Sequence, residues 1–165
     1  EFRRVLFRSA ATSLLPPGVY DGPVGAEAIV INAIADESIT IGSPVIIVAA
    51  ATGELLPRVE PSASQGADAF GVCVGGDDNG TYGGSSEVAA SAAGETVKVC
   101  IFGRCKVRVN GSTGAIALGA NLTIDAVDGI AEVAAASDIV FGRALQASTG
   151  ASDFIACNFN NVGVL

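Results

Sequence analysis

The feature that most constrains the fold is a pattern that occurs twice along the 165 residues. Five segments of the first half match five of the second half in the same order: 29–32 with 107–110, 39–47 with 116–124, 53–55 with 129–131, 69–74 with 140–145, and 97–102 with 154–159. A repeat determines the architecture of the fold. We therefore expect a first β-repeat at 27–102, with a loop insertion at 75–93, and a second β-repeat at 103–165, packed together as one domain.

Each matched segment has the pattern of a β-strand. The segments are short, rich in β-branched residues and separated by Gly, Asn, Asp and Pro, and apolar residues alternate at Val97, Val99 and Ile101. This predicts an all-β fold, an internally duplicated compact β-barrel or sandwich with roughly ten to twelve short strands. We also expect a tight hairpin turn at 102–105 and, as the only helix, one turn each in 87–93 and 132–137.

The composition excludes several classes of function. Half of the residues are apolar and 16% are charged, which is typical of a folded chain, and no apolar run approaches the ~18 residues of a membrane-spanning helix. With 9 Lys and Arg against 17 Asp and Glu, the chain lacks the cations that bind nucleic acid. It has no His, the commonest general base and zinc ligand. We expect no enzyme activity, no cofactor, no metal, and neither nucleic acid nor membrane as a partner.

The first nine residues differ from the rest, being basic and aromatic. The end of a widely used short-read sequencing adapter, read in one frame, translates to these residues in order. We interpret 1–9 as an assembly artefact. Without them the chain keeps 6 cations and 16 anions, a net charge of −10.

Residues 10–26 form an N-terminal arm that lies outside the repeat. Two prolines fix φ and remove amide donors, which favours an extended chain. The arm's candidate contact residues are Leu14, Leu15, Pro16, Pro17, Val19 and Tyr20. Two roles stay open: the arm contacts a capsid protein or neighbouring subunit, or it covers the end of its own barrel.

Four cysteines occur, Cys73, Cys100, Cys105 and Cys157, and no C-x-x-C motif is present. An even number allows disulfides. Because Cys100 and Cys157 occupy matched positions inside predicted strands, we favour buried free thiols that pack as small apolar side chains.

The second half also contains a sequence pattern known from one protein family. Residues 114–125 (GAIALGANLTID), 129–132 (GIAE), 139–145 (IVFGRAL) and 150–155 (GASDFI) resemble the capsid decoration, or cement, proteins of tailed bacteriophages. The resemblance covers 94–159 well and 27–74 more loosely. It implies a compact β-domain and a non-enzymatic structural role on the outer surface of the virion. It also implies a major capsid protein as partner and self-association, as a homotrimer.

Two other classes of protein are compatible with these residues. One is a structural β-module of a tail, a filament or a cell surface. The other is a carbohydrate-binding β-domain, although such domains use exposed aromatic platforms and this chain has no Trp and only Tyr20 and Tyr82 as tyrosines.

Overall fold

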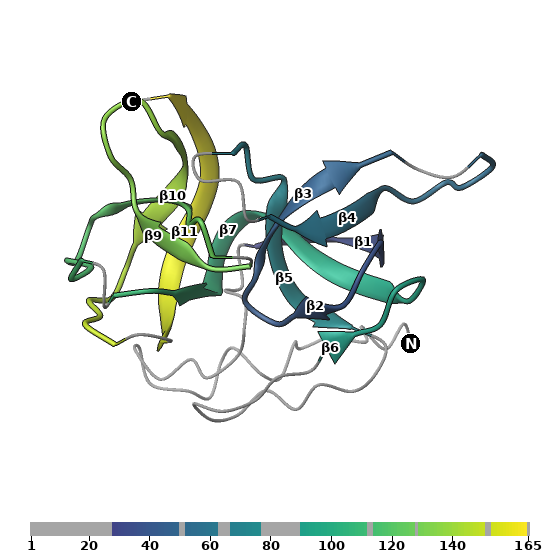
Figure 1. Ribbon diagram of the computed structural model, residues 1–165, viewed down its shortest axis with the longest axis horizontal. Coiled ribbons are helices and arrows are strands. Elements are labelled where there is room, and N and C mark those ends of the chain that lie inside the picture. Colours follow the sequence, from purple (N-terminus) through teal and green to yellow (C-terminus); the bar gives the residue numbers. More distant parts are fainter. Residues whose placement is uncertain are drawn as a thin grey trace, which may run out of the picture.

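The computed structural model describes residues 28–49, 52–62, 67–76, 90–111, 114–127, 129–150 and 153–164. In these ranges the chain forms strands and no helix, which confirms the predicted all-β class (Figure 1). The strands are β1 (Ile29–Ala35), β2 (Ile39–Thr40), β3 (Pro44–Val48), β4 (Arg58–Pro61), β5 (Gly71–Gly76), β6 (Ala90–Ser91), β7 (Thr96–Val109), β8 (Asn121–Ile124), β9 (Ala131–Val133), β10 (Ile139–Ala144) and β11 (Asp153–Val164).

Nine of these strands form one sheet that closes twice on β7. Strands β1, β4, β3, β5 and the first half of β7 pair in that order, and β1 also pairs with β7, so they form a closed five-strand barrel. The second half of β7 pairs with β11, which is followed by β10, β8 and β9, and β9 returns to β7. In Figure 1 the strands of the first barrel lie on the right and those of the second on the left, and β7 runs from one into the other. Closure leaves few open strand edges, as expected.

The two barrels share one pairing scheme. In each, a parallel pair closes the ring, β1 with β4 and β7 with β9, and the other pairs are antiparallel. In the turn before β3 the Gly42 amide donates a hydrogen bond to the Cys73 carbonyl. In the turn before β8 the Gly119 amide donates one to the Ala144 carbonyl. The pairing describes how the strands are connected. Descent of both halves from one duplicated segment stays a prediction.

The structure corrects three local predictions. The expected hairpin at 102–105 is wrong, because β7 runs through these residues and its two halves pair in different barrels. Gly103 has a φ of 95°, and this conformation falls within a strand rather than a turn. The helical turn expected at 132–137 is wrong, because these residues continue β9 and then form a turn. Ala90 and Ser91, in the segment expected to form the other helical turn, form β6.

The predicted loop insertion at 75–93 lies mostly outside the described residues. Of its described ends, Gly75 and Gly76 complete β5, and Ala90 and Ser91 pair with Ile39 and Thr40 of β2.

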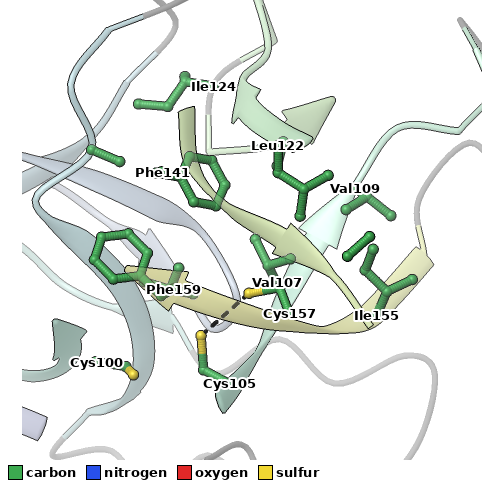
Figure 2. Close-up of a cluster of buried hydrophobic side chains, with 14 of the residues drawn as sticks. Cys100, Cys105, Val107, Val109, Leu122, Ile124, Phe141, Ile155, Cys157 and Phe159 are labelled. Atoms are coloured by element: carbon green, nitrogen blue, oxygen red, sulfur yellow. Dashed lines mark hydrogen bonds between the residues drawn. The ribbon is translucent and has the colours of Figure 1, made fainter. Parts of the chain in front are cut away.

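Aliphatic side chains fill both barrels. The core of the first barrel is a cluster of small residues, Ala33, Ala35, Ile39, Val45, Val59, Cys73, Val97 and Val99. A larger cluster fills the second barrel and includes stacked Phe141 and Phe159, with ring centroids 5.7 Å apart (Figure 2). Val72, Val74 and Cys100, from β5 and the first half of β7, belong to this second cluster. Because side chains alternate along a strand, these three point out of the first barrel and into the contact with the second.

Candidate interaction surfaces

The described residues contain no cluster of side chains suited to a metal ion. Nowhere in these ranges do three side chains of His, Cys, Asp or Glu gather closely enough to hold a metal ion. A helix long and apolar enough to cross a membrane is likewise not found in the part of the chain that the structure describes.

All four cysteines are buried free thiols, as favoured from the sequence. Cys105 and Cys157 face each other across β7 and β11, with their Sγ atoms 3.5 Å apart (Figure 2). The Sγ of Cys100 lies 3.3 Å from the Phe102 carbonyl oxygen, and that of Cys73 lies 3.6 Å from the Gly75 carbonyl oxygen.

Three of these thiols, Cys73, Cys100 and Cys105, have raised pKa values, which disfavour the nucleophilic thiolate form. Burial raises the pKa of Cys73 to about 11, against a partial offset from the Gly75 carbonyl. The hydrogen bond with Cys105, and then burial, raise the pKa of Cys100. For Cys105 the bond with Cys100 lowers the pKa, but the bond with Cys157 and burial outweigh it, so its pKa is also raised. A nucleophilic cysteine needs the opposite shift, so these three side chains serve packing in the two core clusters.

One loop projects from the first barrel, and the guanidinium of Arg58 holds its base in place. The loop joins β3 to β4 and extends away from the rest of the molecule (Figure 1). The Arg58 guanidinium donates to both carboxylate oxygens of Glu54, at 2.6 and 2.7 Å, and to Asp36 at 2.8 Å. Asp36 directly follows β1, so Arg58 connects the base of the loop to the neighbouring strand. These hydrogen bonds raise the pKa of Arg58, which stays charged.

The same loop presents apolar side chains to solvent. Leu55 is 99% exposed and its neighbour Leu56 is 37% exposed. The corresponding connection in the second barrel, between β8 and β9, is shorter and is held by Asp125, whose carboxylate accepts the Val127 amide at 2.9 Å. A projecting loop with an apolar tip is a surface suited to a partner protein.

A second apolar surface lies at one end of the first barrel, which we call the open end. It consists of Ile31, Ile47, Phe70 and Ile101, bordered by Ile29 and Phe102. Neighbouring strands bring these side chains together: Ile29 pairs with Phe102, Ile31 pairs with Val99, and the Phe70 amide donates to the Val45 carbonyl. Ile29, Ile47 and Phe102 are each more than half exposed.

The predicted contact residues of the N-terminal arm, Leu14, Leu15, Pro16, Pro17, Val19 and Tyr20, lie outside the described residues. Sequence reasoning missed both apolar surfaces described above. Leu55 and Leu56 stand beside Gly53 and Pro57, and this apolar pair inside a turn signal is the one cue that the sequence offered.

Comparison with known proteins gives a likeness in structure and none in sequence. No protein-family model matches the chain, and no curated protein matches it. Among solved structures, the chain is similar to the N base of the head fiber gp8.5 in bacteriophage phi29. The TM-score is 0.56 and the sequence identity 17%, over 84% of this chain and 98% of that chain. The two chains therefore share a fold.

Proposed function

We propose that this protein is a non-enzymatic structural component of a bacteriophage head, which decorates the outer capsid surface and stabilises it by bridging capsid subunits. The observation that carries the proposal is the likeness to the head fiber base, whose chain is covered over 98% of its length. The sequence pattern in residues 114–155 that resembles cement proteins also supports a location on the phage head.

The physical character of the chain suits such a role. Two closed barrels that share one long strand have few free edges, and this discourages aggregation of a protein present in many copies. The net charge of −8 disfavours contact with DNA and favours solubility. In this proposal the major capsid protein is the partner, the Leu55 tip is a contact with it, and self-association produces a homotrimer on the shell.

Co-sedimentation tests the proposal. The purified chain is mixed with expanded empty heads assembled from the major capsid protein of the phage genome that encodes it, and bound protein is measured in the pellet. Saturable binding to expanded heads, with a head-to-protein ratio set by the capsid lattice, is the expected result. Absence of binding at micromolar concentrations to both expanded and unexpanded heads would overturn it.

The same preparation separates the alternatives. A filament or tail module would assemble alone, so long polymers in electron micrographs of the purified chain contradict the head role. A carbohydrate-binding domain would bind a glycan array and not heads. Among the described residues, Phe102 is the one aromatic side chain that is more than half exposed, which gives a sugar little platform.

A second candidate follows from the described role of the structural neighbour as a base of a head fiber. In this version the chain is the head-bound foot of an extended fibre. Antibody labelling of intact virions distinguishes the two, since label at the root of a projecting fibre supports the foot and label on compact knobs supports decoration.

A further inference from the structure

The two barrels differ most at one end. Their pairing schemes correspond residue by residue: β3 pairs Val45 with Gly71, and β8 pairs Leu122 with Gly142. Hence Ile47 corresponds to Ile124, and Phe70, just before Gly71, corresponds to Phe141. On the next strand, Val99 pairs with Cys73 and Cys157 pairs with Ala144, so Val99 corresponds to Cys157 and Ile101 to Phe159. Ile31 pairs with Val99 and Cys105 pairs with Cys157, so Ile31 corresponds to Cys105.

In the second barrel this end is closed. Ile124, Phe141 and Phe159 are at most 1% exposed, and Cys105 is 3% exposed (Figure 2). The first barrel covers them, because Ala69, Val72, Val74 and Cys100 belong to the same buried cluster. The second barrel thus receives a cap of small apolar side chains.

In the first barrel none of the described residues forms such a cap over the corresponding end. Ile47 is 53% exposed, and Ile31, Phe70 and Ile101 are half-buried against the first core. The border residues Ile29 and Phe102 are 53% and 51% exposed. Exposed apolar side chains grouped at one barrel end mark an interaction surface.

We infer that residues 14–20 of the same chain are that segment and bind the open end of the first barrel. The chain enters the barrel at this end, since Ile29 is the first residue of β1 and borders the surface. Tyr20 precedes Ile29 by few residues, and an extended linker of this length reaches about 30 Å. A short tether also gives the segment an effective concentration in the millimolar range.

The chemistry of the segment matches the surface. Between Arg8 and Asp21 the chain carries no charge, and this stretch contains Leu14, Leu15, Val19 and Tyr20. Pro16 and Pro17 restrict the free segment, which lowers the entropy lost on binding. Of the two roles that the sequence left open for the arm, this is coverage of its own barrel.

Tyrosine fluorescence tests the inference in the full chain. The protein has no Trp and only two tyrosines, so Tyr82→Phe leaves Tyr20 as the single reporter. We expect acrylamide to quench Tyr20 several-fold less efficiently than it quenches free N-acetyltyrosinamide. Ile47→Asp, which places a charge on the open end, should restore efficient quenching. Leu118→Asp, at a 72% exposed leucine of the second barrel, is the matched control and should leave Tyr20 protected.

Each other outcome overturns the inference. Efficient quenching in the Tyr82→Phe parent shows that Tyr20 is not bound. Protection that survives both Ile47→Asp and Phe102→Asp shows that it binds elsewhere. Protection that disappears on hundred-fold dilution shows that the segment comes from another copy. Circular dichroism confirms that the variants fold, and Phe102→Asp serves if Ile47→Asp does not. The test involves no capsid, so its failure is independent of the proposed head role.

Discussion

Gly42 and Gly119 make the same hydrogen bond in the two barrels, from their amides to the carbonyls of Cys73 and Ala144, at 2.7 and 2.8 Å. Both have a positive φ, 84° and 82°. Their surroundings differ. A Cβ on Gly42 would lie 2.6 Å from Cε1 of Phe154, whereas a Cβ on Gly119 would meet nothing within 4 Å. The turn before β3 therefore also serves as a contact between the barrels, where the Arg108 amide donates to the Gly42 carbonyl at 2.8 Å.

These two glycines separate backbone strain from packing. Gly119→Ala should lower the free energy of unfolding by about 1 kcal/mol, the cost of a left-handed conformation for an L-residue. Gly42→Ala carries the same strain and also displaces Phe154, so we expect a loss of about 2 to 4 kcal/mol. Urea denaturation followed by circular dichroism measures both. Equal losses in the two variants would contradict the described contact of the turn with β11.

The order of the strands was predictable, but part of their register was not. The matches of 39–47 with 116–124 and of 69–74 with 140–145 agree with the strand pairing, because each contains a glycine that the turn or the close strand approach requires. The match of 97–102 with 154–159 is wrong by one residue, since Val99 and not Cys100 corresponds to Cys157. Such a shift reverses every side chain.

Alternating aliphatic residues explain a second failure. The match of 29–32 with 107–110 is also displaced, because Ala35 occupies the place of Val109 beside the parallel strand. Two segments with alternating apolar residues match almost equally well when one is shifted by any even number of residues. Only pairing with the neighbouring strand fixes the correct alignment. The apolar tip at Leu55 and the open end were unpredictable for a related reason, since exposure depends on what covers a residue.

Truncating one of the two stacked phenylalanines should show how much the second core contributes. Phe159 is 1% exposed and stacks on Phe141, so Phe159→Ala should destabilise the protein by about 3 to 5 kcal/mol. Phe102→Ala removes the same side chain from a position that is 51% exposed, and we expect a loss below about 1 kcal/mol. Denaturant midpoints provide the comparison. Similar losses in both variants would argue against a closed second barrel.

Alkaline pH should destabilise the fold through the buried thiols. Burial raises the pKa of Cys73 from 9.0 to about 11, so the unfolded chain releases this proton at lower pH than the folded chain. The stability contributed by the neutral thiol is complete below about pH 9 and is lost as the pH rises towards 11. In Cys73→Ala the fall in unfolding free energy over this interval should be shallower, by up to about 1.4 kcal/mol per pH unit. Unfolding curves under reducing conditions measure the slope, and identical slopes would contradict the shift.

The projecting loop gives the sharpest test of how the protein contacts a head. Leu55→Asp replaces a side chain that is 99% exposed, so the fold and its melting temperature should not change. If the tip is buried against the capsid protein, the charge should weaken head binding at least ten-fold, because a desolvated carboxylate without a partner is costly. Leu118→Asp makes the same change on a turn of the second barrel and should bind like the parent. Equal binding by all three proteins in the co-sedimentation assay would remove the loop from the interface and direct the search to other exposed surfaces of the two barrels.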